Sequence, residues 1–436
     1  MTETLVITGA QLLGADSVDI VVEDGRIAEM GSGLTRSGAR VIDADGLIAL
    51  PGLVDLHTHL REPGYEASET ILTGTRAAAS GGYTAVFAMP NTMPVADSAG
   101  VVEQELALGE AAGYATVQPI GAVTVGQRGE RLAELGAMAG SRAKVRVFSD
   151  DGFCVWDPLI MRRALEYVKS FGGVIAQHAQ DPRLTEGAQM NEGAVSAELG
   201  LAGWPAVAEE SIIARDVLLA EHVGSRLHIC HLSTAGSVDL IRWAKKRGIR
   251  VTAEVTPHHL LLTDELVRGY DARFKVNPPL RRDEDVRAVR EGLADGTIDI
   301  VATDHAPHPA EAKATEWAAA AHGMVGLESA LRVVHKTMVE TGLIGWTDVA
   351  RVMSEAPAQI GGLASHGKPI AAGQPAELTL YDPSAGGDFS VGDLAGRSTN
   401  SPFIGQSLPG SVRWTIHRGY VTLADGTLID LEEAGA

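Results

Sequence analysis

The segment Val54-Asp55-Leu56-His57-Thr58-His59-Leu60-Arg61-Glu62-Pro63-Gly64 closes an apolar run that begins at Leu47. In an extended strand, residues i and i+2 point to the same side, so His57 and His59 can present two imidazoles to one point in space. Neutral imidazole is a common ligand of zinc-like ions. An isolated pair of this kind is more often two half-buried histidines at a strand end. The rest of the chain has to decide between these two interpretations.

Seven further apolar, β-branched runs follow the first one, and Ala/Leu/Glu-rich helical segments separate most of them. This alternation is typical of βα units around a parallel sheet, and eight such units in about 300 residues predict an α/β fold with a TIM-type (β/α)8 barrel. The predicted strands are 48–57, 83–89, 115–123, 144–149, 174–177, 226–230, 250–255 and 298–302. Helices are expected at 68–80, 159–171, 205–221 and 235–246.

Both ends of the chain have a different character. Residues 1–50 read as short strands with a hairpin turn at Asp24-Gly25. After about residue 366 the helical pattern stops, and strands are expected at 377–381 and 411–423, followed by a turn at Ala424-Asp425-Gly426. We therefore expect a small composite β-domain, formed by residues 1–50 and 367–436, beside a catalytic barrel domain of residues 51–366.

The composition is that of a globular protein, because 45% of the 436 residues are hydrophobic and 21% are charged. The net charge of −20 argues against a nucleic-acid partner, which needs a basic surface, but it allows a small anionic substrate held by a local arginine. The apolar runs are too short to cross a membrane, and the N-terminus lacks the pattern of a signal peptide. Cys154 and Cys230 lie far apart without metal-type spacing, so a reducing cytoplasm is the expected setting.

Polar residues that can bind metals or substrates follow seven of the eight predicted strands. They are His57 and His59, Asn91, Asp150-Asp151-Gly152, His178, His231, Thr256-Pro257-His258-His259 and Thr303-Asp304-His305-Ala306-Pro307-His308. Only the third strand, which ends near Thr124, carries no such signal. In a TIM barrel the carboxyl ends of all strands lie on one face, where active sites are built. The pattern therefore predicts a metal site on that face.

The ligand set contains histidine and aspartate but no thiolate, which suits Zn²⁺ better than Mg²⁺ or Ca²⁺. Four histidines and two aspartates exceed one tetrahedral zinc. Either two metals share a bridging group, or one metal leaves some of these residues as acid/base or supporting groups. Asp304 is the natural general base, and Arg61 can form a bidentate fork with a carboxylate.

Several blocks together resemble the cyclic amidohydrolases, specifically dihydroorotases of the bacterial type I class. Besides the opening segment, they are Ala88-Met89-Pro90-Asn91-Thr92, Phe148-Ser149-Asp150-Asp151-Gly152, Gln177-His178-Ala179-Gln180-Asp181, His228-Ile229-Cys230-His231-Leu232-Ser233-Thr234, Glu254-Val255-Thr256-Pro257-His258-His259, Lys275-Val276-Asn277-Pro278-Pro279-Leu280-Arg281 and Thr303-Asp304-His305-Ala306-Pro307-His308. The resemblance covers nearly the whole chain.

The resemblance implies one or two Zn²⁺ ions and a set of roles for these residues. The implied metal ligands are His57, His59, His178, His231, Asp304 and Asp151, with Asp151 bridging where two ions bind. The choice of Asp151 over Asp150 rests on the resemblance alone. The implied substrate contacts are Arg61, Asn91, Asn277, His308, His322 and Gly323.

The implied reaction is the reversible closure of N-carbamoyl-L-aspartate to (S)-dihydroorotate and water in pyrimidine biosynthesis. A metal-bound hydroxide would be the nucleophile in the hydrolytic direction, and Asp304 would be the general acid/base. The sequence leaves open whether the chain forms a homo-oligomer or binds aspartate transcarbamoylase. It also leaves open the role of His258 and His259 and whether residues 309–323 act as a lid.

Two features depart from the family pattern. Many cyclic amidohydrolases carry a metal-bridging carboxylated lysine on the fourth strand, whereas this chain has Val145-Arg146-Val147-Phe148 there, with Lys144 just before. This favours a dihydroorotase over a hydantoinase or allantoinase, which are the alternative enzymes. The segment around His322-Gly323 also differs from the usual one. A second alternative is a non-catalytic scaffold subunit for aspartate transcarbamoylase.

Overall fold

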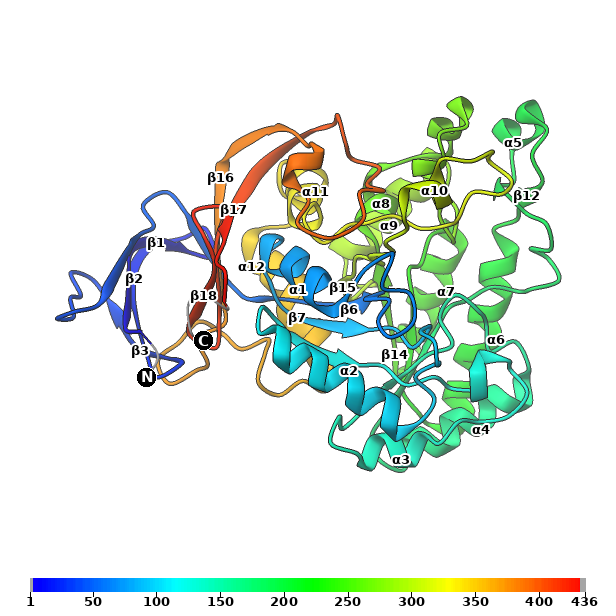
Figure 1. Cartoon of the computed structure of the whole chain (residues 1–436). Helices are drawn as coiled ribbons and strands as arrows, with labels where there is room; N and C mark the ends of the chain where they lie inside the picture. The colour runs from blue at the N-terminus through cyan, green and yellow to red at the C-terminus, as the bar shows by residue number, and fades with distance from the viewer. Residues whose placement is uncertain (1–2, 432–436) are drawn as a thin grey trace.

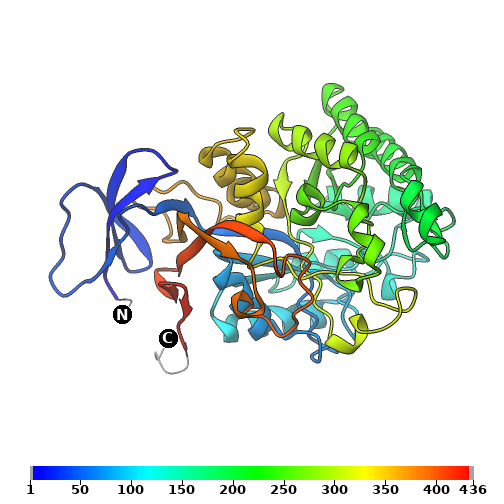
Figure 2. The same ribbon diagram turned by 90° about the horizontal axis from the view of Figure 1, so that it is seen from above.

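The computed structural model describes residues 3–431, which form a barrel and, beside it, a sheet made from both ends of the chain (Figure 1). Figure 2 shows the same arrangement from above, with the N-terminal strands on the left and the barrel with its helices on the right. The predicted fold class, a TIM-type barrel with a composite β-domain, is confirmed.

Eight parallel strands make the barrel: β6 (Leu53–Thr58), β7 (Tyr83–Ala88), β8 (Thr116–Pro119), β9 (Val147–Phe148), β10 (Val174–Gln177), β13 (Leu227–Ile229), β14 (Val251–Val255) and β15 (Ile300–Val301). They pair as β6-β7-β8 and as β9-β10-β13-β14-β15. Two isolated parallel bridges, Gly121 with Phe148 and Thr58 with His305, join these groups into a closed ring. Consecutive βα units are therefore neighbours around the ring, as the barrel fold requires.

Side chains fill the inside of the barrel, among them Val54, Leu56, Phe87, Ala176 and Ile300. Each of these residues is at most 2% exposed. Because the strand interiors are packed in this way, reactive groups find space only where the strands end.

The first predicted strand, 48–57, is wrong in one respect, because the structure divides it into two strands. β5 (Ile48–Pro51) pairs in parallel with β1 and antiparallel with β16, whereas β6 begins at Leu53 and belongs to the barrel. Gly52 lies between them, and a Cβ atom there would lie 2.4 Å from Thr84 Oγ1. The chain thus passes from one sheet to the other through a position that has no space for a side chain.

Within residues 3–431 the terminal sheet has nine strands: eight follow the order β19-β18-β17-β16-β5-β1-β2-β3, and β4 pairs with β1. Its remaining strands are β1 (Leu5–Leu12), β2 (Ser17–Glu23), β3 (Arg26–Gly31), β4 (Arg40–Asp43), β16 (Leu378–Asp388), β17 (Ser407–His417), β18 (Tyr420–Ala424) and β19 (Thr427–Leu428). Asp24 and Gly25 both have positive φ in the predicted hairpin turn between β2 and β3. Asp425 and Gly426 also have positive φ, in the predicted turn between β18 and β19.

Helices lie around the barrel and on some of its loops (Figure 1). They are α1 (Ile71–Ser80), α2 (Ala99–Ala112), α3 (Leu135–Gly140), α4 (Pro158–Lys169), α5 (Ala194–Leu199), α6 (Val207–Val223), α7 (Ala235–Lys246), α8 (Pro257–Leu261), α9 (Asp283–Ala294), α10 (Ala310–Lys313), α11 (Ala330–Val334), α12 (Trp346–Ala350) and α13 (Ala356–Gly361). The short strands β11 (Met190–Asn191) and β12 (Gly203–Trp204) form a small sheet within an insertion. None of the helices within residues 3–431 is long and apolar enough to cross a membrane.

Two segments lie at the loops of the barrel. In the segment 309–323, whose role as a lid the sequence leaves open, only Ala310–Lys313 is helical. Residues between β16 and β17 return to the barrel, because Asn400 donates from Nδ2 to the carbonyls of Ala306 (3.0 Å) and Gly323 (3.2 Å). Part of the C-terminal segment therefore supports the barrel loops as well as the terminal sheet.

Candidate active site

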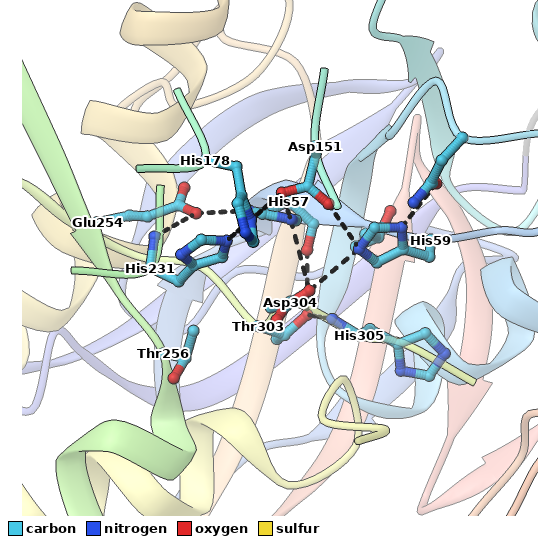
Figure 3. Close-up of polar contacts among 12 residues, drawn as sticks. His57, His59, Asp151, His178, His231, Glu254, Thr256, Thr303, Asp304 and His305 are labelled. Carbon is cyan, nitrogen blue, oxygen red and sulfur yellow. Dashed lines mark hydrogen bonds and ion pairs between the residues drawn. The ribbon is translucent and has the colours of Figure 1, made fainter. Parts of the chain in front are cut away.

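Four histidines and two aspartates from separate strand ends converge on the predicted face of the barrel (Figure 3). They are His57, His59, Asp151, His178, His231 and Asp304, and each is at most 5% exposed. The first two lie at or just after the end of β6, and the others follow β9, β10, β13 and β15. The sequence prediction brought together the same six residues.

Asp151 lies at the centre of this cluster. Its Oδ1 atom is 3.3 Å from His57 Nε2, 3.3 Å from His178 Nδ1 and 3.4 Å from His231 Nε2. Its Oδ2 atom is 3.3 Å from His59 Nε2. The carboxylate therefore faces two groups of histidines, one from β6 and one from β10 and β13.

Asp304 lies on the β6 side only. Its Oδ1 atom is 3.1 Å from His59 Nε2 and 3.4 Å from His57 Nε2. The residue has φ of 48°, a left-handed conformation that side chains rarely adopt and that occurs at functional sites. The strained turn after β15 thus aims the carboxylate at the histidine pair.

The hydrogen bonds on the outer side of the rings test whether a cation fits between these groups. His57 Nδ1 donates to Glu254 Oε1 at 2.6 Å, so in the neutral ring, which is the form that binds a metal, Nε2 carries the lone pair. That lone pair faces the oxygens of Asp151 and Asp304, and His57 Nε2 has no hydrogen-bond partner within residues 3–431. Acceptors that point at acceptors in a buried site require a positive charge between them. The nitrogen and oxygen atoms that face one another here can therefore act as ligands of a divalent metal.

The other rings are held in the same way. His59 Nδ1 donates to Asn91 Oδ1 at 2.8 Å, and His178 Nε2 donates to Gln180 Oε1 at 2.8 Å. The inner nitrogens of His178 and His231 are only 2.9 Å apart. Acceptors on the outer nitrogen orient a metal-binding imidazole and select its tautomer. Both outer hydrogen bonds therefore leave the inner nitrogen of a neutral ring with a lone pair directed into the cluster.

The charges of the cluster favour positive charge at the inner nitrogens, where a bound metal would take the place of a proton. Burial lowers the pKa of His57, but the carboxylates of Asp151, Glu254 and Asp304 outweigh it and raise the pKa well above its usual value. The site thus holds uncompensated negative charge, which a bound cation would neutralise.

Glu254 and Asp55 support the site, although sequence reasoning assigned them no role. Glu254 accepts hydrogen bonds from His57 Nδ1, from His228 Nε2 at 3.0 Å and from the backbone N–H of His231 at 3.1 Å. Asp55 accepts from the N–H of His57 at 3.0 Å and from the hydroxyl of Thr303 at 2.5 Å. A carboxylate inside an apolar strand is costly to bury, and this was the signal that could have found both residues.

Replacing Glu254 by glutamine is expected to weaken metal binding by about 10- to 100-fold. Glutamine replaces one carboxylate oxygen by an amide nitrogen that cannot accept, so at least one of the hydrogen bonds from His57, His228 and the N–H of His231 is lost. Competition with a chromophoric chelator measures the affinity, and Glu265→Gln, an exposed change on another loop, is the control. Unchanged metal affinity in Glu254→Gln would show that Glu254 does not support the site.

The structure brings Asp151 into the cluster and directs Asp150 elsewhere. Asp150 Oδ1 accepts from the backbone N–H groups of Val123 (2.8 Å) and Thr124 (3.0 Å), so it fixes the loop after β8. Lys144 is exposed and donates to Gly140 O at 3.2 Å. The lysine therefore lies away from the site, as expected from its position before β9.

The predicted substrate residues lie on loops around the cluster. Asn91 contacts His59, as described above, and Arg61 Nε donates to Pro307 O at 3.2 Å. Asn277 Nδ2 donates to Gln180 Oε1 at 3.0 Å, while Asn277 Oδ1 is buried without a partner within residues 3–431. His308 Nε2 donates to His322 O at 2.7 Å, next to Gly323.

His258 and His259 do not join the groups of close ligand atoms found within residues 3–431. His259 Nδ1 lies 2.8 Å from Thr256 Oγ1, at the start of α8, so this histidine has a structural role. A second His/Glu group, His366 with Glu377 and His417, lies near β16 and β17. There His417 Nδ1 donates to Glu377 Oε2 at 2.8 Å, and His366 Nε2 lies 3.2 Å from Thr84 O. Both histidines of this second group therefore already have acceptors within the protein.

Comparison with solved structures agrees with this fold. L-hydantoinase (dihydropyrimidinase) from Arthrobacter aurescens superposes with a TM-score of 0.87 at 24% identity and covers 99% of this chain and 98% of its own. Dihydropyrimidinase from Brevibacillus agri NCHU1002 gives 0.83 at 22% identity, with 98% and 96% covered. The structural likeness gives the fold, and the buried His/Asp cluster together with sequence relatives places the chain among the metal-dependent cyclic amidohydrolases.

Sequence relatives identify the family within this class. The chain is 74% identical over 428 residues to the dihydroorotase of Leifsonia xyli, with 98% of both chains covered. It is 67% identical to that of Streptomyces coelicolor (98% and 100% covered) and 56% identical to that of Mycobacterium tuberculosis (98% and 99% covered). The family model described as dihydro-orotase-like matches residues 46–237. The chain belongs to the dihydroorotase family.

Proposed function

We propose that the chain catalyses the reversible closure of N-carbamoyl-L-aspartate to (S)-dihydroorotate and water, with Zn²⁺ as its metal, in de novo pyrimidine biosynthesis. The observation that carries the proposal is the buried carboxylate of Asp151 between two groups of histidine nitrogens, with Arg61 beside one group. The names of its close relatives support the same substrate pair.

Two ions are proposed, with Asp151 as the shared ligand. His57, His59 and Asp304 would complete one set, and His178 and His231 the other. Bound ions of this kind supply a Lewis acid for the ring amide carbonyl and lower the pKa of water. The nitrogen- and oxygen-rich donor set, without a thiolate, suits zinc.

Asp304 is proposed to move the proton. In the hydrolytic direction its carboxylate takes a proton from the attacking water and returns it to the ring nitrogen as the amide bond breaks. In the synthetic direction the same group takes the proton from the carbamoyl nitrogen as the C–N bond forms and gives it to the departing hydroxyl group, which leaves as water. Burial raises the pKa of Asp304, but the nearby charges and hydrogen bonds of His57 and His59 outweigh it and lower the pKa, so the group starts as a base.

Arg61, Asn91, Asn277 and His308, with the backbone near His322 and Gly323, are proposed to bind the substrate. The guanidinium of Arg61 forms only one hydrogen bond, through Nε, within residues 3–431, so its two terminal nitrogens can form a fork with a carboxylate. Such contacts orient the substrate without taking part in bond making.

Replacing Arg61 by lysine is expected to raise KM for dihydroorotate by about 10- to 100-fold and to change kcat much less. An ammonium cannot reproduce the two parallel hydrogen bonds of a guanidinium. Steady-state kinetics measure the effect, and Arg131→Lys, at an exposed arginine, is the matched control. A KM equal to that of the unchanged enzyme would remove Arg61 from carboxylate binding.

The relative turnover of dihydroorotate and an uncharged hydantoin tests the proposed substrate. Hydantoinases share the fold, but their sequences are only 20–24% identical to this chain. We expect dihydroorotate to react faster because Arg61 pairs with its carboxylate. Faster turnover of the hydantoin would contradict the proposal.

The cytoplasmic setting, a homo-oligomer and binding to aspartate transcarbamoylase stay predictions. Co-purification with aspartate transcarbamoylase tests the predicted binding.

A further inference from the structure

Two buried lysines join the two loops that carry part of the proposed substrate site. Lys313, at the end of α10, donates from Nζ to the carbonyls of Ala272 (3.0 Å), Lys275 (3.0 Å) and Ala321 (2.7 Å). An ammonium has three N–H bonds, and here each one has a carbonyl. The side chain therefore crosses from its own loop to residues 272–275 and holds them together.

Lys275 makes the reciprocal connection. Its Nζ donates to the carbonyls of Trp317 (2.6 Å) and Ala318 (3.2 Å), and it lies 5.8 Å from the centre of the Trp317 ring. Lys275 is 1% exposed and Lys313 is 9% exposed. We call Lys275 and Lys313 together the lysine clamp.

The clamp lies directly behind proposed substrate contacts. Asn277 follows Lys275 by two residues, and the N–H of Gly323 donates to Lys275 O at 3.0 Å. His322 follows Ala321, whose carbonyl accepts from Lys313. A shift of either lysine would therefore move Asn277 relative to His322 and Gly323.

The charge of the clamp is not balanced locally. Within residues 3–431, neither ammonium forms a hydrogen bond or an ion pair with a carboxylate, although buried charges are usually paired. Asp271 acts on Lys313 at longer range but is already paired with Arg273 at 2.6 Å. Burial, together with the charges of Lys275 and Lys313, lowers the pKa of His322 to about 4, so this ring does not add to the positive charge.

We propose that the lysine clamp positions the loops around Asn277 and His322-Gly323 and supplies positive potential that selects an anionic substrate. This inference rests on the proposed function. Lys275 and Lys313 are positioning residues, because their ammonium groups bind main-chain carbonyls and not the substrate itself. The two ammonium groups would give this acidic protein a local positive potential that attracts a carboxylate.

The pH dependence of KM is the readout that separates this role from simple structural support. Burial and the charge of Lys275 lower the pKa of Lys313 to about 7, and the charge of Asp271 opposes them. Above that pH the neutral amine has two N–H bonds for three carbonyls, and its charge is lost. KM for dihydroorotate is therefore expected to rise as the pH increases above about 7.

The test compares Lys313→Met, Lys275→Met and Lys313→Arg in the metal-loaded full chain, with Lys144→Met at an exposed lysine as the control. We expect both methionine variants to raise KM for dihydroorotate by about 10- to 100-fold with a smaller change in kcat. Lys313→Met should also lose the rise of KM above pH 7, and Lys313→Arg, whose charge does not titrate, should keep a low KM at high pH. Metal content and circular dichroism should not change.

Different outcomes separate the failure of this inference from failure of the proposed function. If the wild-type chain prefers dihydroorotate and the methionine variants keep its KM and its pH profile, the clamp has no role in substrate selection. If the wild-type chain prefers an uncharged hydantoin, both the function and the clamp's selectivity are wrong. If Lys313→Met does not fold, Lys275→Met, which removes the hydrogen bonds to Trp317 O and Ala318 O, tests the inference instead, and a wild-type KM in that variant overturns it.

Discussion

Replacing Asp304 by alanine is expected to lower turnover in both directions by about 10³-fold or more. The carboxylate has its Oδ1 atom 3.1 Å from His59 Nε2, at the proposed reaction centre. Asp151 is surrounded by four imidazoles and Glu254 lies behind His57, so neither can replace it as a proton carrier. Initial rates with dihydroorotate and with N-carbamoyl-L-aspartate measure the two directions.

Asp304→Asn separates proton transfer from metal binding. Asparagine keeps the size of the side chain and one oxygen, but it cannot accept and return a proton. We expect a loss of turnover close to that of alanine while more of the metal is retained. Near-normal turnover in either variant, at full metal content, would remove Asp304 from the mechanism.

Removal of the metal is expected to reduce activity to the limit of detection, a loss of about 10³-fold or more, and added Zn²⁺ is expected to restore it. The cluster brings lone pairs and carboxylates together without donors between them, as at His57 Nε2. Dialysis against a chelator, followed by metal analysis and assay, measures this. A metal-free chain with full activity would contradict the proposed centre.

The number of ions follows from the same experiment. We expect two per chain, because Asp151 faces His57 and His59 through one group of contacts and His178 and His231 through another. Replacing His178 and His231 by alanine should leave one ion on the β6 side, whereas the same change at His259, which bonds Thr256, should leave two. One ion in the wild-type chain would show that Asp151 does not bridge.

Sequence patterns were sufficient for the barrel and for five residues of the cluster, whereas the choice of Asp151 over Asp150 rested on the family resemblance. Each strand of the barrel is a short apolar run, and the residue after it must lie on the carboxyl face, so His178 and His231 could be placed without coordinates. The pair His57 and His59 followed from the two-residue period of a strand. The pattern did not predict the division of the first run at Gly52, because the residues before and after Gly52 are similarly apolar.

Residues that act through long-range contacts could not be found in this way. Asn400 lies 94 residues from Ala306 in the chain, yet its amide supports the loop that carries His308. Nothing in the sequence distinguishes Lys275 and Lys313 from surface lysines. Only the structure shows that both are buried and that they donate to main-chain carbonyls. No local pattern encodes such partners.

The sequence by itself determined the ring of βα units and the chemical type of the site, because hydrophobic periodicity and strand ends are local properties. The tertiary structure supplied the physical reason for Asp151 rather than Asp150, because the two are adjacent in the chain but face different partners. It also decided the tautomers of His57 and His178, through Glu254 and Gln180. These choices depend on which distant atoms pack within about 3 Å, and closure of the barrel sets those distances.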